Sequence, residues 1–324
     1  MTEGQAPKTM PEATGSPGPV PEGSFVRAAR AIDRWYRPAL PPERLAALRI
    51  LVGAFSTVYL AIRTPQLFGL ATLGGFRPTG LATLLSGPLP DAVVVAQPLV
   101  ALALGVAFTL GLAYRVTGPA FALALVWVLT YRNSFGMIFH TENLTVAHVL
   151  VLGCSRAADV WSLDARRAAR RGRPAPAPSP AHGWPVRLLA LVTVAAYLLA
   201  GLAKLRLSGL TWAASDLLRN YIAYDNLRKL LLADWYSPLG AWLVGHAWIF
   251  PPLAFASLLI ELLAPLALVG PRVARVWSWL AWSFHAGVLA IMAIFFPYPL
   301  LGLAFAPLFE VEKLPLFRRL RRAR

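Results

Sequence analysis

Long apolar stretches separated by shorter polar segments run along most of the chain. Eight of them can be outlined, near residues 45–62, 92–113, 117–131, 143–155, 186–205, 250–269, 273–295 and 298–310. A helix needs roughly 20 mainly apolar residues to cross the core of a bilayer. The pattern therefore predicts an all-α polytopic membrane protein with about eight transmembrane helices, of which the third, fourth and eighth are short.

The polar segments predict further elements. Residues 1–24 are rich in Pro, Gly, Glu and Thr, which is typical of a disordered tail. Residues 25–37 carry arginines at spacings of three and four, as in an amphipathic helix on a membrane surface. The transmembrane domain is expected over 38–312, and a basic tail over 313–324. The long segment between the fifth and sixth stretches contains DLLRNYIAYDNLRKLLL, which favours interfacial helices over an open loop.

Composition supports the membrane assignment. The chain of 324 residues is 57% hydrophobic and only 14% charged, whereas soluble domains carry about a quarter charged residues. These values exclude a soluble globular enzyme and a disordered protein. The single cysteine, Cys154, excludes an internal disulfide.

The net charge of +16 admits a nucleic-acid partner, but the distribution of basic residues gives a simpler explanation. With a cytoplasmic N-terminus, 23 of the 31 basic residues fall in inside segments and seven in outside segments. This split follows the positive-inside rule and predicts that both termini are cytoplasmic. Nucleic acid is therefore not an expected partner. The Arg-rich, Ala-rich and Pro-rich composition points to a bacterial cytoplasmic membrane.

Ionisable residues inside the apolar stretches are the first functional candidates, because they are costly in a membrane. Lys204 lies near the outer end of the fifth stretch, in a chain that has only four lysines. A lysine without hydration or a fixed counter-charge can become a neutral amine and act as a general base, which arginine cannot do. The alternative is a lysine that snorkels at the membrane edge.

A second polar group opens the fourth stretch in the segment FHTENLTVAHVL. His140, Glu142 and Asn143 are candidate substrate-binding residues there. The structural alternative is a helix cap by Thr141, with Glu142 in the first turn. That alternative leaves His148, inside the apolar run, without an explanation.

Two further candidates lie mid-stretch near the C-terminal end of the chain. Glu261 occupies the sixth stretch and His285 the seventh, with Trp282 on the same helical face as His285. Glu261 and His285 either hydrogen-bond to pin two helices together or contribute to a proton path or ligand pocket. No metal-ligand spacing such as HExxH or CxxC is present, so no metal is predicted.

Three local matches, in order along the chain, carry a family resemblance. They are AAYLLAGLAKL around Lys204, the run from HTENL to DVWSLD, and Phe284-His285 followed by Phe296-Pro297-Tyr298. With these segments the chain resembles the membrane domain of the vitamin K-dependent gamma-carboxylase family, also called the horizontally transferred transmembrane (HTTM) domain family. The resemblance extends over roughly residues 40 to 310.

The resemblance implies oxidation of a hydroquinone at a membrane-embedded site, with reduced menaquinone or vitamin K hydroquinone as co-substrate. Lys204 matches the catalytic lysine, and His285 joins it as a catalytic candidate. His140, Glu142, Asn143, Glu261 and Trp282 become candidate substrate-binding residues, and we expect Lys204, Glu142, Asn143 and His285 to line one cavity. The animal enzymes have a second lysine where this chain has Ala203, and an Asn-His pair where it has Glu142-Asn143.

Three functions stay open from the sequence. The first is a quinone-linked enzyme or maturation factor that acts at the outer membrane face on a lipid-soluble or secreted-peptide substrate. The second is a proton-coupled transporter that uses Glu261, His285 and Lys204 as a relay. The third is a non-catalytic membrane partner of another protein.

Overall fold

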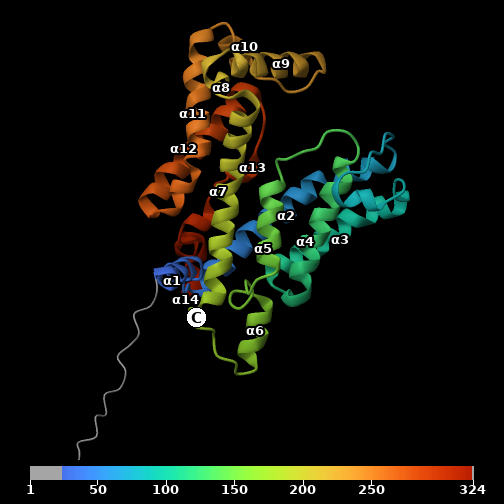
Figure 1. The fold of residues 1–324 in the computed structure, drawn as a ribbon. Coiled ribbons are helices and arrows are strands. Elements are labelled where there is room, and N and C mark those ends of the chain that lie inside the picture. The colour runs from blue at the N-terminus through green and yellow to red at the C-terminus, as the bar shows by residue number, and fades with distance from the viewer. Residues whose placement is uncertain (1–23, 323–324) are drawn as a thin grey trace, which may run out of the picture. The chain divides into compact units, whose positions relative to one another are not determined.

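The computed structural model describes residues 24–322, and within them the regular elements are helical (Figure 1). An isolated bridge pairs Leu40 with Ser179. The longest helices are α2 (Pro42–Phe68), α3 (Asp91–Leu110), α4 (Tyr114–Asn133), α7 (Pro180–Ser208) and α12 (Pro271–Met292). The shorter helices are α1 (Ser24–Tyr36), α5 (Asn143–Gly153), α6 (Leu163–Arg170), α8 (Thr211–Ala214), α9 (Leu217–Leu231), α10 (Pro238–Leu243), α11 (Phe250–Leu262), α13 (Pro297–Leu300) and α14 (Arg318–Arg322).

Within residues 24–322, three helical segments are long and apolar enough to cross a membrane. They are Pro42–Ala71, Asp91–Leu110 and Pro180–Ser208, while Asn143–Gly153 and Ala247–Leu262 are apolar but shorter. Many large apolar side chains on these helices are exposed, as expected for surfaces that face lipid. The class of helical membrane protein is confirmed, whereas the number of eight crossings and the orientation of the termini remain predictions.

Most of the eighth predicted span, residues 298–310, is not α-helical. Within 298–310, α13 ends at Leu300, and only a 3₁₀ turn at Ala306–Leu308 follows. Proline has no backbone N–H to continue a helix, and Pro299 and Pro307 both lie here. Gly302 has a φ of +75°, which lies in the left-handed region. Prolines also shorten the sixth stretch, because α11 ends at Leu262 and a 3₁₀ turn containing Pro265 replaces its predicted end.

Residues 37–322 form one packed unit in which α2 and α7 are central. Helix α2 contacts α3, α5 and α7, and α7 in turn contacts α5 and α11. The larger cluster of buried side chains lies between these helices and includes Leu48, Phe121, Val149 and Tyr298. The segments that connect these long helices pack against the ends of the bundle.

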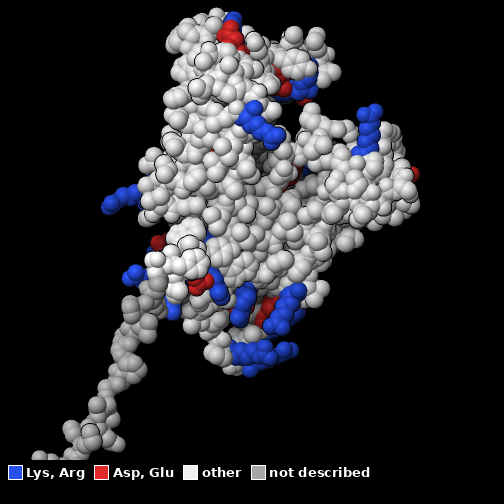
Figure 2. Space-filling view, in the orientation of Figure 1, with Lys and Arg blue, Asp and Glu red and all other residues white. Residues whose placement is uncertain are grey.

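The helices predicted between the fifth and sixth stretches are present as α8, α9 and α10. They lie together at the end of the unit where α7 ends and α11 begins (Figure 1). Helix α6 lies at the opposite end of the unit, and Figure 2 shows basic side chains gathered there. The two ends therefore differ in charge, as the sequence predicted, and the interfacial position of α9 remains a prediction.

Helix α1 belongs to a separate unit of the chain, residues 1–36. It covers most of the predicted amphipathic segment, and Phe25, Ile32 and Trp35 are exposed on it. Its attachment to a membrane surface remains a prediction. The predicted disordered tail lies outside the described residues except for Ser24, and the last two residues of the basic tail do so as well.

Candidate active site

The amine of Lys204 is held by the carboxylate of Glu261. Nζ lies 2.6 Å from both Glu261 oxygens, and the two side chains are 20% and 5% exposed. Lys204 lies one turn before the end of α7, and Glu261 lies near the end of α11. The expectation of a lysine without a fixed counter-charge was wrong, because the Glu261 carboxylate on α11 supplies that charge.

A glycine allows the two helices to approach closely at this pair. Gly201 lies three residues before Lys204, on the same face of α7. A Cβ added to Gly201 would lie 3.0 Å from the Cβ of Glu261 and from a methyl carbon of Leu262. The Ala-Gly-x-x-Lys segment thus combines a close helix contact with the residue that pairs across it.

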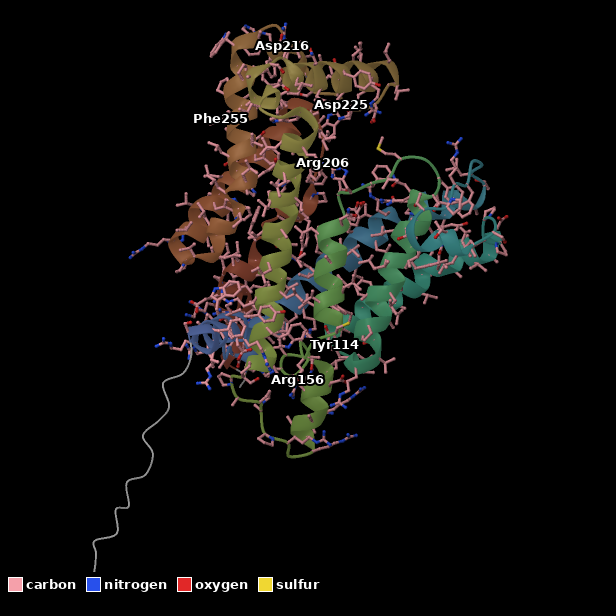
Figure 3. All side chains as sticks on the ribbon, in the orientation of Figure 1. Tyr114, Arg156, Arg206, Asp216, Asp225 and Phe255 are labelled. Atoms are coloured by element: carbon pink, nitrogen blue, oxygen red, sulfur yellow. The ribbon has the colours of Figure 1, made fainter. Side chains whose placement is uncertain are left out.

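Two aromatic rings flank the ammonium of Lys204. Nζ lies 5.0 Å from the ring centroid of Trp212 on α8 and 5.6 Å from that of Phe284 on α12. Both distances fall in the range of cation–π interactions. In Figure 3 the labelled Arg206, two residues beyond Lys204, marks this end of α7. The labelled Asp216 and Asp225 mark the start and the middle of α9.

His285 lies next to Phe284 and pairs with Tyr197. Its Nε2 is 2.7 Å from the hydroxyl of Tyr197, which lies on the α7 face that also carries Gly201 and Lys204. His285 is 8% exposed, and its Nδ1 has no hydrogen-bond partner among residues 24–322. The interpretation in which Glu261 and His285 bond to each other is wrong, since each takes a different partner on α7.

Phe296 connects His285 with the polar segment before α5. Its ring centroid is 5.1 Å from that of His285 and 6.0 Å from that of His140. His140 is exposed and lies on the connection between α4 and α5. The structure therefore brings Lys204, Glu261, His285 and His140 into one chain of neighbours through Phe284 and Phe296.

Glu142 has partners of its own and does not contact Lys204. Arg132 donates to both of its oxygens, at 2.9 and 3.2 Å, and the hydroxyl of Tyr59 donates a short hydrogen bond to one of them. Burial raises the pKa of the Glu142 carboxyl, but the hydrogen bonds and charge of Arg132 outweigh it and lower that pKa to about 2. The alternative in which Thr141 caps the helix is wrong. Helix α5 begins at Asn143, and neither Thr141 nor Glu142 caps it with its side chain.

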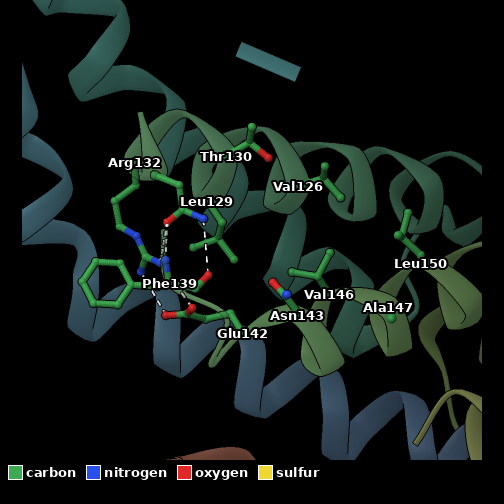
Figure 4. Close-up of a pocket in the computed structure, with 11 residues that line it drawn as sticks. Val126, Leu129, Thr130, Arg132, Phe139, Glu142, Asn143, Val146, Ala147 and Leu150 are labelled. Atoms are coloured by element: carbon green, nitrogen blue, oxygen red, sulfur yellow. Dashed lines mark hydrogen bonds and ion pairs between the residues drawn. The ribbon is translucent and has the colours of Figure 1, made fainter. Parts of the chain in front are cut away.

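A cavity of about 290 Å³ lies between α4 and α5 beside this ion pair (Figure 4). Arg132, Phe139, Glu142 and Asn143 line its polar end, and Val126, Val146 and Leu150 line its apolar part. Lys204 and His285 are not among its lining residues. This cavity holds two of the four residues expected in one cavity, and a shared cavity remains a prediction.

Trp282 lies apart from Lys204, in a second cavity along α12. Its Nε1 donates to the carbonyl oxygen of Leu300 at 2.9 Å. His148 is fully buried in the core, where its Nδ1 lies 2.6 Å from the hydroxyl of Tyr298 and its Nε2 3.1 Å from that of Thr193. His148 therefore ties α5 to α7 and to the segment around α13.

The ionisable residues of the site were predicted from the sequence, but the residues that pair with them were not. Tyr59 and Tyr197 look like ordinary apolar residues of spans in the sequence, and Trp212 lies in the connection after the fifth stretch. Arg132 ends α4 and was counted only as an outside charge. Arg132 lies only ten residues before Glu142, and this short separation is the signal in the sequence that indicates the pair.

The fold and the site define a class: a helical membrane protein with a partly buried Lys–Glu pair, flanked by aromatic rings, near the end of an apolar helix long enough to span a membrane. A model of the HTTM domain family matches residues 36–312. The chain belongs to the HTTM domain family, which is consistent with its resemblance to the vitamin K-dependent carboxylases. Comparison with curated proteins and with solved structures found no match.

Proposed function

We propose that this protein is a membrane enzyme that oxidises a reduced quinone, with Lys204 as the base. One observation carries the proposal: the Lys204 amine, paired with Glu261, lies between the rings of Trp212 and Phe284, and the next residue, His285, has an Nδ1 without a partner among residues 24–322. Membership of the HTTM domain family supports the same chemistry.

The residues around Lys204 fit a hydroquinone. A flat ring with two hydroxyl groups needs apolar or aromatic faces and hydrogen-bonding atoms at its edge. Trp212, Phe284 and Phe296 supply the faces, and Lys204 and His285 supply the polar atoms. When bound, reduced menaquinone or vitamin K hydroquinone would supply an acidic hydroxyl group and the electrons that oxygen takes.

The ion pair gives Lys204 a route to its neutral form. Transfer of one proton from Nζ to a Glu261 oxygen 2.6 Å away converts the charged pair to an amine and a carboxylic acid. Exclusion of water favours this neutral pair, because desolvation penalises both charges. The amine can then accept a proton from a hydroxyl group, and Glu261 holds the proton that Lys204 gave up.

His285 is oriented to bind rather than to accept the first proton. If the Tyr197 hydroxyl donates to Nε2, the imidazole proton lies on Nδ1, which then donates a hydrogen bond. A donor at this position stabilises an oxygen that becomes negative as its proton leaves. The same proposal includes a second substrate, which is modified after the quinone is oxidised. This substrate is lipid-soluble or a secreted peptide, and it is modified at the outer face of a bacterial cytoplasmic membrane.

Mass spectrometry of small molecules that co-purify with the protein tests the proposal. The expected result is a bound isoprenoid quinone in the wild type, with much less in a Phe284→Ala variant and an unchanged amount in Phe255→Ala, which alters an exposed ring on α11. Proton-dependent flux in liposomes without a bound quinone would contradict it and favour a transporter. Stable co-purification of another chain without quinone or flux would contradict it and favour a non-catalytic partner.

A further inference from the structure

A second cavity, of about 590 Å³, lies between α12 and the irregular segment after α13. The residues that line it include Arg275, Ser278, Trp279, Leu300, Leu301 and Phe305. None of the residues around Lys204 is among them. Its volume falls within the range of small-molecule sites, and its lining is almost wholly apolar apart from two polar side chains.

The lining residues of α12 form one face of the helix. Arg275, Ser278, Trp279 and Trp282 follow the spacing i, i+3, i+4, i+7, and they extend over about 10 Å. Trp279 and Leu301 are exposed at the rim, whereas Phe305 is buried at the floor. The cavity is therefore an apolar groove with a cationic group at the end where α12 begins.

Ser278 and Arg275 both lack partners within residues 24–322. Ser278 is 7% exposed, and its hydroxyl oxygen has no hydrogen-bond partner there. A buried hydroxyl without a partner is costly, and helical serines usually avoid this by bonding to the carbonyl four residues earlier. Arg275 is exposed one turn into α12, and no described carboxylate pairs with it. Both groups are free to bind a ligand.

We propose that this groove binds an acidic phospholipid from the leaflet around the start of α12. The phosphate pairs with the guanidinium of Arg275, because that group matches phosphate oxygens with two parallel donors. The Ser278 hydroxyl donates to an ester carbonyl one turn deeper. One acyl chain lies along Trp279, Leu300 and Phe305. The site is independent of the quinone chemistry proposed for Lys204.

Native mass spectrometry of the full-length protein, titrated with phosphatidylglycerol and with phosphatidylcholine of the same chain length, tests the proposal. The wild type should bind phosphatidylglycerol more tightly than phosphatidylcholine by about five-fold, the worth of one basic residue beside an acidic headgroup. Arg275→Gln should abolish that preference, because it should weaken phosphatidylglycerol more than phosphatidylcholine, whose choline cation already neutralises the phosphate. Ser278→Ala should weaken both lipids by about five-fold, the worth of one hydrogen bond.

Arg272→Gln is the matched control, because Arg272 lies three residues before Arg275 on α12 but does not line the groove. It should change either affinity by less than about two-fold, if the site and not the surface potential is responsible. Equal affinity for the two lipids in the wild type would overturn the proposal. So would an equal loss in Arg272→Gln and Arg275→Gln, or the retention of a quinone in the groove in place of either lipid.

Discussion

Two buried carboxylates, Glu261 and Glu142, each take a basic partner from another helix, and they do so in different surroundings. Glu261 meets Lys204 between two aromatic rings, while Glu142 meets Arg132 beside a cavity and also accepts from Tyr59. A buried charge that loses its partner is far more costly than a pair that is removed as a whole. The two pairs therefore respond differently to substitution and to pH.

Removal of one member of the Lys204–Glu261 pair should be more damaging than removal of both. We expect Lys204→Met and Glu261→Met each to lower the free energy of unfolding by about 3 kcal/mol, since each leaves the opposite charge without its partner. The double variant Lys204→Met/Glu261→Met should be less destabilised than the sum of its single variants. Thermal unfolding in detergent measures this cycle, and strict additivity of the two single effects would show that the pair is not coupled.

The Glu142–Arg132 pair should contribute stability that is lost in acid. The folded-state pKa of Glu142 is lowered from 4.5 to about 2, so its contribution is complete above about pH 5 and disappears as the pH falls toward 2. Glu142→Gln should lower the unfolding temperature clearly at pH 7 and much less at pH 3. Glu310→Gln, at an exposed pair with Arg44, is the control and should have little effect at either pH. A pH-independent difference for Glu142→Gln would contradict this account.

The candidate residues were predictable from the sequence, but their pairing was not. Lys204, Glu142, Glu261 and His285 are noticeable because a charge or an imidazole inside an apolar run is costly. Their partners depend on which helix faces meet, and that information is spread over the whole bundle. The sequence also offered no reason to prefer Tyr197 over other apolar-run aromatics as the partner of His285.

At the scale of helices, the apolar runs predicted most elements within a few residues. The elements that differ contain proline or glycine. Hydropathy predicted a span over 298–310, but Pro299 and Pro307 have no backbone N–H to continue a helix there. The same reasoning applies to α11, whose continuation is broken at Pro265. Hydropathy indicates which segments are apolar enough for a membrane, whereas the backbone N–H groups and φ angles determine whether a helix continues.

Close approach of α4 and α5 requires two glycines. A Cβ added to Gly118 would lie 2.7 Å from the carbonyl oxygen of Gly153, and one added to Gly153 would lie 2.6 Å from that of Gly118. We expect Gly118→Ala and Gly153→Ala each to destabilise the protein by about 1–3 kcal/mol, because the backbones must move apart. Gly287→Ala on α12, where an added Cβ meets nothing within 4 Å, should be neutral or slightly stabilising. Equal unfolding temperatures for all three variants would refute the close contact.

At the scale of the whole molecule, the basic residues predict the orientation in the membrane. The 156–187 segment, which contains α6, should lie in the cytoplasm, and α9 should lie on the outer side. In a Cys154→Ala background, Arg170→Cys should react with a membrane-impermeant thiol reagent only after permeabilisation. Tyr224→Cys, on the exposed surface of α9, should react in intact cells. If Arg170→Cys reacts in intact cells and Tyr224→Cys does not, the predicted orientation is wrong.

The central claim is that Lys204 acts as a base in quinone oxidation, and quinol turnover in membranes tests it most directly. Lys204→Arg keeps the positive charge opposite Glu261 but cannot give up its proton, so turnover should fall by at least about 100-fold. Arg206→Lys, two residues further along α7, controls for a basic substitution at the same helix end and should keep turnover near that of the wild type. With expression matched, equal turnover in the wild type and Lys204→Arg would remove Lys204 from the mechanism and contradict the account.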